Sequence, residues 1–169
     1  MIRLLPETPD DSFEVEYLYD TCFAPGRQAL SSYRLRDAAP VAGLSHLLRD
    51  EYDSVVGAIR HWPVRIGAGG APALLLGPVA IHPTRQGEGL GGLLIRDALE
   101  RAEALGWLRV VLIGDAPYYA RFGFAQNTAL EFPPPTNPAR ILSCALAEGA
   151  FEAVAGMVHP WGENPVAPA

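Results

Sequence analysis

Residues 73–92 read ALLLGPVAIHPTRQGEGLGG, an apolar segment followed by a glycine-rich turn. Its first part, 73–81, is a nearly continuous apolar run, which is typical of a strand that is covered on both faces. Within the run, Gly77-Pro78 predicts a bulge or a local parting from the next strand, because proline cannot donate to a ladder and glycine has no side chain to pack. A glycine-rich turn follows directly, where the chain leaves the strand.

The glycine turn opens a long helix, which we predict over 88–105. Apolar residues recur there at three- and four-residue steps and form one stripe, and Gly106 is placed to end the helix as a left-handed cap. The apolar segment 108–113 then predicts a second strand, so that 73–113 forms a β-α-β unit. Glycines at the start of a helix let backbone N–H groups approach a ligand, and the positive end of the helix dipole favours an anion. We therefore expect a pyrophosphate to bind at this turn.

The flanking sequence predicts a mixed sheet rather than repeated β-α units. A cluster of acidic residues, Asp10 and Asp11 before Ser12, caps a segment whose Phe13, Tyr17 and Leu18 have helical spacing, although Phe13, Val15, Tyr17 and Tyr19 also alternate as in a strand. The cap favours a helix. The other expected elements are strands at 2–5, 42–49, 54–62 and 141–146 and helical segments at 28–37 and 117–122, with 42–62 forming an antiparallel hairpin.

Composition limits the class of protein. The chain has 169 residues, 49% of them hydrophobic, which suits one domain over 1–160 with a loose tail at 161–169. The start of the sequence has no signal-peptide pattern and no apolar run is long enough to cross a bilayer, so we expect a cytoplasmic protein with no membrane partner. A net charge of −6 argues against a nucleic-acid partner. Cys22 and Cys144 lack metal-ligand spacing and are expected to be free thiols, with no metal.

A glycine-rich turn has several structural explanations. A P-loop would need Lys-Ser or Lys-Thr after the glycines, and none follows. A dinucleotide-binding turn would follow an opening strand, whereas this one follows an apparent hairpin. A purely structural turn is the remaining alternative.

With its flanks, the turn resembles the coenzyme A signature of the GNAT family of N-acetyltransferases, Gln/Arg-x-x-Gly-x-Gly/Ala. Here it reads Gln86-x-x-Gly89-x-Gly91, and the later Tyr119-x-x-x-Gly123-Phe124 is similar to that family's Tyr-x-x-x-Gly-Phe segment. The resemblance covers roughly 42–125. It implies the GNAT acyl-CoA N-acyltransferase fold, an α/β (α+β) fold in which a mostly antiparallel sheet has splayed strands and flanking helices. Segments 23–27, 33–36 and 76–78 further resemble a bacterial branch described as YhbS-type predicted N-acetyltransferases.

The resemblance also implies roles for particular residues. Pantetheine would pair with the backbone of the central strand, and the N–H groups of the turn would hold the pyrophosphate. The cofactor-binding residues are then expected to be Val79, Ala80, Ile81, Gln86, Gly87, Glu88, Gly89, Leu90 and Gly91. Tyr119 matches the family tyrosine that assists departure of the coenzyme A thiolate, and aromatic packing is its alternative role.

The base that would accept a proton from the amine is harder to assign. An alkylamine with a pKa near ~10.4 is almost wholly protonated at neutral pH. Members of the family often use a glutamate or histidine of the central strand, but 74–81 contains no ionisable side chain. A water chain or another element must substitute, and the candidates are Asp50, Glu51, His46 and His61.

The sequence thus predicts an enzyme that transfers an acetyl group directly from acetyl-CoA, its cosubstrate, to a primary amine. The amine belongs to a small molecule or a peptide. Two other functions stay open, an acyl-CoA-binding regulatory domain without catalysis and an O-acyltransferase. A homodimer is one alternative for the oligomeric state.

Overall fold

The computed structural model describes residues 1–23 and 31–162. Its sheet is built from nine strands. They are β1 (Arg3–Pro6), β2 (His46–Arg49), β3 (Val55–Ile66), β4 (Ala71–Ile81), β5 (Arg109–Ile113), β6 (Ala125–Gln126), β7 (Leu130–Glu131), β8 (Ile141–Ala145) and β9 (Gly156–Pro160). The helices are α1 (Ser12–Cys22), α2 (Leu90–Ala104) and α3 (Ala116–Ala120), with 3₁₀ segments η1 (Pro9–Asp11), η3 (Ser31–Leu35), η4 (Pro83–Arg85) and η5 (Pro138–Arg140).

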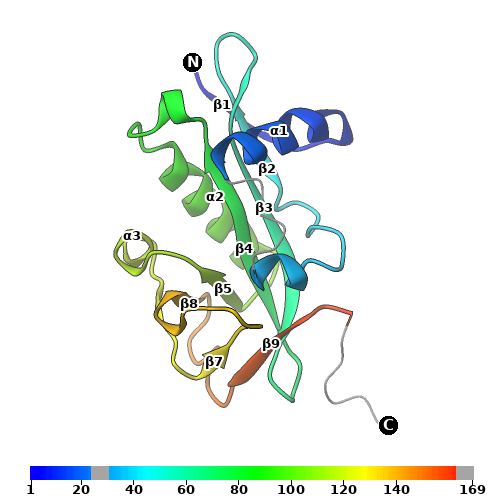
Figure 1. Cartoon of the computed structure of the whole chain (residues 1–169), viewed down its shortest axis with the longest axis vertical. Helices are drawn as coiled ribbons and strands as arrows, with labels where there is room; N and C mark the ends of the chain where they lie inside the picture. Colours follow the sequence, from blue (N-terminus) through cyan, green and yellow to red (C-terminus); the bar gives the residue numbers. More distant parts are fainter. Residues whose placement is uncertain (24–30, 163–169) are drawn as a thin grey trace.

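The strands lie in the order β1-β2-β3-β4-β5-β8-β6, and β9 joins the far end of β3 (Figure 1). All pairs of this path are antiparallel except β4 with β5, which are parallel because α2 carries the chain across between them. The mixed, mostly antiparallel sheet that the sequence predicts is therefore confirmed.

The sheet is covered on both faces. One face packs on α2, whose Leu94, Ile95 and Ala98 share a buried cluster with residues of β3, β4 and β5. The other face packs on α1 through Val15, Leu18 and Tyr19. Figure 1 shows α2 behind the long strands β3 and β4, and α1 near their upper end. The nearly continuous apolar character of β4 follows from this burial on two sides.

Several predicted elements differ from the observed ones. The helix at 12–22 is confirmed, but Phe13 and Tyr17 are 83% and 69% exposed, so they do not belong to its buried stripe. The strand predicted from residue 42 begins only at His46, and the last strand, β9, was not predicted because its short GMVHP sequence lacks clear alternation. Of the helical segment predicted at 28–37, 31–35 form η3. Residues 24–30, and with them part of the resemblance at 23–27, lie outside the described residues.

The end of the described chain is held against β3. Arg65 donates a hydrogen bond to the carbonyl of Trp161 at 3.1 Å, and its guanidinium lies 3.9 Å from the Trp161 ring centroid. Residues 163–169 of the predicted tail are outside the described part. Within that part, no helix is long and apolar enough to span a bilayer. Cys22 and Cys144 are free thiols, as predicted.

Candidate active site

The gap between β4 and β5 begins at Gly77-Pro78. Their parallel pairing is limited to Leu74 with Val110 and Leu75 with Val111. On the other side of β4, the register with β3 shifts so that Gly77 and Pro78 together face Arg60. Gly77 has φ +126°, a value that favours glycine, and the Tyr19 hydroxyl donates to the Pro78 carbonyl at 3.2 Å. The predicted bulge and parting are both present, and they leave one edge of β4 open beyond Leu75.

The glycine turn lies at the end of this open edge. Gly87 and Gly89 have φ of +86° and +78°, so side chains there would be strained although the space around them is open. Gly89 is the N-cap of α2. A hydrogen bond connects the turn to the end of β4, because Gln86 Nε2 donates to the Ile81 carbonyl at 3.3 Å. The first turn of α2 consequently presents its backbone N–H groups at the mouth of the gap.

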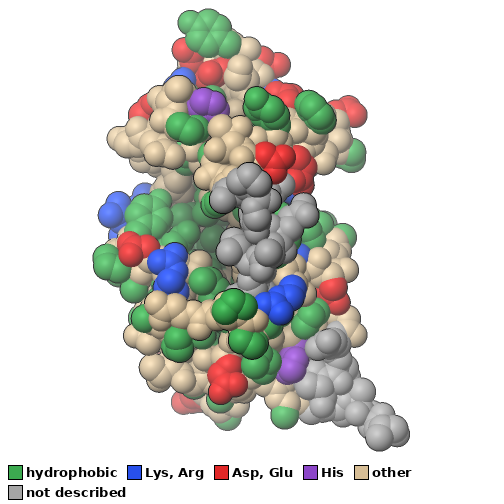
Figure 2. Space-filling view, in the orientation of Figure 1, with side chains coloured by type: hydrophobic (Ala, Val, Ile, Leu, Met, Phe, Trp, Pro, Cys, Tyr) green, Lys and Arg blue, Asp and Glu red, His purple; other side chains and the backbone are tan. Residues whose placement is uncertain are grey.

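A groove of about 610 Å³ runs along the open edge and the turn. The predicted residues that line it are Val79, Ala80, Ile81, Gln86, Gly87, Gly89, Leu90 and Gly91. Glu88 does not line it, since its carboxylate accepts a hydrogen bond from Arg85 at 3.0 Å. In the space-filling view, hydrophobic side chains fill a hollow at mid-height and basic side chains stand at its margin (Figure 2).

Three arginines line the groove that the sequence motif did not identify. Arg85 also interacts with Asp50, at 3.8 Å. The Arg96 guanidinium lies 5.0 Å from the ring centroid of Phe122, and that of Arg121 lies 4.8 Å from the ring of Tyr118. The sequence does not place them together, because they come from η4, α2 and the end of α3, and only the fold brings these elements side by side. The groove thus combines helix-terminal N–H groups with three positive charges, which suits a polyphosphate.

Tyr119 lies at the junction of this groove and a second cavity, which it also lines. Its helix, α3, is capped at the N-terminus by Asp115, whose side chain accepts from the Tyr118 N–H at 3.1 Å. The Tyr119 ring is packed edge-on against Tyr118 and Phe124, with centroids 5.0 and 5.8 Å away. Burial is the main cause that raises the pKa of Tyr119 to about 12. Its hydroxyl is therefore protonated at neutral pH and able to donate.

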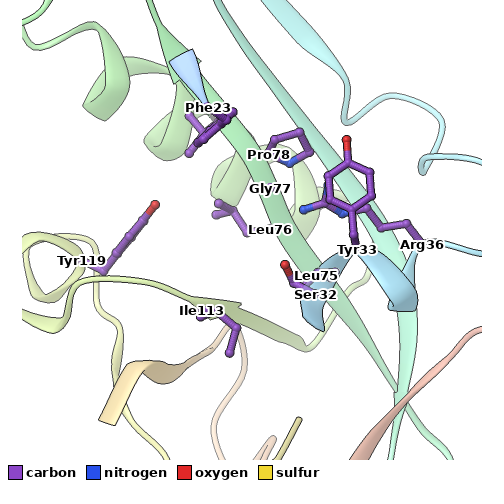
Figure 3. A pocket seen from close by; sticks show the side chains of 11 residues that line it. Phe23, Ser32, Tyr33, Arg36, Leu75, Leu76, Gly77, Pro78, Ile113 and Tyr119 are labelled. Atoms are coloured by element: carbon purple, nitrogen blue, oxygen red, sulfur yellow. The ribbon is translucent and has the colours of Figure 1, made fainter. Parts of the chain in front are cut away.

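The second cavity, of about 150 Å³, occupies the gap itself (Figure 3). Its walls come from β4, the end of β5, η3 and α3. The lining residues are Phe23, Ser32, Tyr33, Arg36, Leu75, Leu76, Gly77, Pro78, Val79, Ile113 and Tyr119. Figure 3 shows Tyr119 on one side of this cavity and Tyr33 and Arg36 on the other. Val79 and Tyr119 line both cavities, so the two are adjacent.

The four candidate bases do not line the cavity in the gap, as far as the chain is described. His61 is fully buried in the sheet, with Nδ1 3.0 Å from the Leu44 carbonyl, and burial lowers its pKa to about 4. Burial likewise lowers the pKa of His46. At the hairpin turn, Asp50 accepts backbone N–H groups of Tyr52 and Ser54, and Glu51 lies 3.5 Å from the terminal amine of Met1. Asp50, Glu51 and His61 are thus each held by a contact, whereas His46 Nδ1 is buried without a hydrogen-bond partner among the described residues.

Known proteins resemble this chain in sequence. The family model described as "Acetyltransferase (GNAT) domain" matches residues 43–126. The uncharacterized N-acetyltransferase YhbS of Escherichia coli strain K12 is 26% identical over 155 residues, which are 90% of this chain and 92% of that protein. The uncharacterized N-acetyltransferase YjhQ of the same strain is 44% identical over 50 residues, 30% of this chain and 28% of that protein.

Two crystal structures resemble the fold. The structure of E. coli YhbS in complex with CoA has a TM-score of 0.79 at 26% identity and covers 95% of this chain and 88% of that one. A GNAT family acetyltransferase from Brucella melitensis, in complex with acetyl-CoA, is 30% identical with a TM-score of 0.64 and covers 87% of this chain and 89% of that one. The resemblance inferred from the two motifs is confirmed.

Proposed function

The chain belongs to the GNAT family of acetyltransferases, and from this premise we propose that it transfers an acetyl group from acetyl-CoA to a primary amine. The observation that carries the proposal is the position of Tyr119, which lines both the groove and the cavity in the gap. A hydroxyl donor thus stands where a thioester in the groove meets an acceptor in the gap. The Brucella and E. coli relatives bound to acetyl-CoA and CoA support the assignment of the groove.

The charged side chains and the backbone N–H groups that line the groove are suited to binding coenzyme A. Two phosphates would lie against the N–H groups of the turn, where Gly87 and Gly89 hold the backbone in its left-handed conformation. Arg96 and Arg121, on the groove wall, would neutralise remaining negative charge. Pantetheine amides would pair with the open edge of β4 at Val79 and Ile81, as an added strand does. Of the predicted cofactor residues, Glu88 would contribute only its backbone N–H, because its carboxylate accepts from Arg85.

Acetyl transfer has two steps, attack by the amine and departure of the CoA thiolate. The neutral amine attacks the thioester carbonyl carbon, the C–N bond forms, and the tetrahedral intermediate collapses as the C–S bond breaks. Tyr119 gives its proton to the leaving sulfur, the amine loses one proton to water, and Tyr119 then regains a proton from water, which restores the starting enzyme. The Tyr119 hydroxyl has a proton to give at neutral pH, although burial raises its pKa to about 12 and so makes it a weaker acid than an exposed tyrosine.

An amine suits this cavity better than an alcohol. In the described part of the chain no carboxylate or imidazole lines the cavity in the gap. An ammonium ion can lose its proton to water and is then a nucleophile, whereas a hydroxyl is too weak an acid for water to activate it and needs a base at the site. The lack of a lining base therefore favours N-acylation over O-acylation.

The test is release of CoA thiol from acetyl-CoA with amines and with matched alcohols, beside thermal unfolding with and without acetyl-CoA. We expect acetyl-CoA in ~100-fold excess over Kd to raise Tm by a few degrees, and amines to stimulate thiol release. Stabilisation without release by any amine would identify a binding domain instead. Faster release with alcohols would identify an O-acyltransferase.

A further inference from the structure

One peptide of β4 is held by a side chain from outside the sheet. The Tyr19 hydroxyl, on α1, donates to the Pro78 carbonyl at 3.2 Å, and the Tyr19 side chain is fully buried. Pro78 has no N–H with which to pair with β3, and the register between β3 and β4 is broken beside it. The hydrogen bond from α1 therefore fixes β4 at a point where the ladder is interrupted.

The pairing beyond the break shows where the next N–H of β4 points. The His82 N–H donates to the Val56 carbonyl at 2.8 Å, and in the same register Val79 lies opposite Ile59. The backbone groups of an antiparallel strand alternate between its two edges. Val79, three residues before His82, consequently directs its N–H and C=O away from β3, toward the open edge of β4. Because Val79 lines both cavities, as Tyr119 does, its N–H lies where the proposed reaction places the thioester.

We propose that Tyr19 is a positioning residue for acetyl transfer, because its hydroxyl holds the Pro78–Val79 peptide with the Val79 N–H directed at the thioester oxygen. The inference rests on the acetyl transfer proposed above. The Pro78 carbonyl and the Val79 N–H belong to one planar trans peptide and point in opposite directions, so a bond that fixes the carbonyl also aims the N–H. A hydrogen bond to the carbonyl further polarises the peptide and strengthens its N–H as a donor.

The oxygen of the tetrahedral intermediate gains negative charge and is stabilised by a donor that is already in place. The Val79 N–H supplies such a donor, and the Val79 carbonyl, at the same edge, is left to pair with pantetheine. Tyr19 is not among the described residues that line either cavity. It therefore acts on the reaction through the backbone of β4 and not by contact with the substrate.

The Tyr19 ring is itself held by Arg60 of β3. The Arg60 guanidinium lies 5.3 Å from the Tyr19 ring centroid. It donates to both carboxylate oxygens of Glu7, at 3.0 and 2.8 Å, and to Glu16 at 2.7 Å. Burial raises the pKa of Tyr19, so its hydroxyl keeps its proton at neutral pH and can donate. This network gives the donor of the Pro78 hydrogen bond one orientation.

The kinetic test compares Tyr19→Phe with Val15→Ala, which removes methyl groups from the same buried cluster and leaves the hydroxyl in place. Both variants should lower Tm. Only Tyr19→Phe should lower kcat, on the order of 10- to 100-fold, with little change in the Kd for acetyl-CoA. Kinetics are measured below both melting temperatures, with the amine that most stimulates thiol release by the wild type. Equal falls of kcat in the two variants would reduce Tyr19 to a packing residue and overturn the inference.

Infrared spectroscopy of acetyl-CoA labelled with carbon-13 at the thioester carbonyl reports the hydrogen bond without any amine. Binding to the wild type should move the carbonyl band to lower wavenumber, and Tyr19→Phe should return it toward its position in solution. Val15→Ala, and a ring-fluorinated tyrosine that retains the hydroxyl at this position, should keep the wild-type band. A wild-type band at its solution position, or equal bands in the wild type and Tyr19→Phe, would overturn the inference and leave acetyl transfer intact. Thiol release that no amine stimulates would instead contradict the transfer, while the band still tests Tyr19 by itself.

Discussion

A Cβ on Gly114 would stand 2.5 Å from Cε2 of Tyr119, closer than side-chain atoms approach. Gly114 follows β5 directly, and its N–H donates to the Arg140 carbonyl at 2.9 Å, which fixes its backbone. The Tyr119 ring therefore occupies the space that any other residue at 114 would fill. A glycine outside both sequence motifs thus sets the position of the tyrosine between the two cavities.

Gly114→Ala should accordingly displace the Tyr119 ring. We expect kcat to fall at least ~10-fold and the stability to fall by about 1–3 kcal/mol, as overpacking usually costs. Gly69→Ala is the control, because a Cβ there meets nothing within 4 Å. Steady-state kinetics and urea unfolding of both variants check the prediction. Unchanged kcat in Gly114→Ala would mean that the ring position is not needed for turnover.

Tyr119→Phe removes one hydroxyl and leaves the aromatic packing in place. If the hydroxyl protonates the thiolate, kcat should fall on the order of 10²- to 10⁴-fold, while the Kd for acetyl-CoA changes little. Kd from calorimetry and kcat from thiol release separate the two effects. Tyr17→Phe, at a tyrosine that is 69% exposed on α1, should match the wild type. Near-normal turnover of Tyr119→Phe with chemistry rate-limiting would assign Tyr119 to packing alone.

No single replacement of Glu51, His46 or His61 should abolish activity. These side chains do not line the cavity in the gap, and water is left as the acceptor of the proton. We expect Glu51→Gln, His46→Gln and His61→Gln to retain kcat/KM within ~10-fold once measured below their melting temperatures. A loss of ~10³-fold in one variant, reversed at high pH, would identify it as a dedicated base.

The turn and the order of elements were predictable because their signals are local. A cluster of glycines before a helix, a helical apolar stripe and a Gly-Pro pair inside an apolar strand are each recognisable within a short stretch of sequence. The helix face at Phe13 and Tyr17 was wrong, since spacing alone cannot tell which apolar residues a neighbouring strand will cover. Arg36, Arg96 and Arg121 come from separate elements, and their approach to the cavities depends on tertiary packing.

Gly89→Glu tests the phosphate site at the start of α2. The substitution puts a side chain on a backbone with φ +78° and adds a negative charge where phosphate should lie. We expect the increase in Tm on adding acetyl-CoA to disappear, and calorimetry to show at least a ~100-fold weaker Kd. Gly87→Ala has a similar backbone strain without the charge and serves as the comparison. Equal affinity of Gly89→Glu and wild type would remove the basis for the groove assignment.

The stability of the protein should depend on pH through His61. Burial lowers the pKa of His61 from 6.5 to about 4, so between these values the unfolded chain binds a proton that the folded chain does not. The stability tied to neutral His61 is thus complete above pH 6.5 and is lost as the pH falls toward 4, by up to about 1.4 kcal/mol per pH unit.

Urea unfolding at intervals from pH 7.5 to 4 should show this slope in the wild type and a shallower one in His61→Gln, in which an amide can still donate to the Leu44 carbonyl. Some slope should remain in the variant, because burial also lowers the pKa of His46. His159→Gln, at a half-buried position on β9, is the control for removal of an imidazole from a less buried site. Equal slopes in the wild type and His61→Gln would show that His61 is protonated in the folded protein as readily as in the unfolded chain.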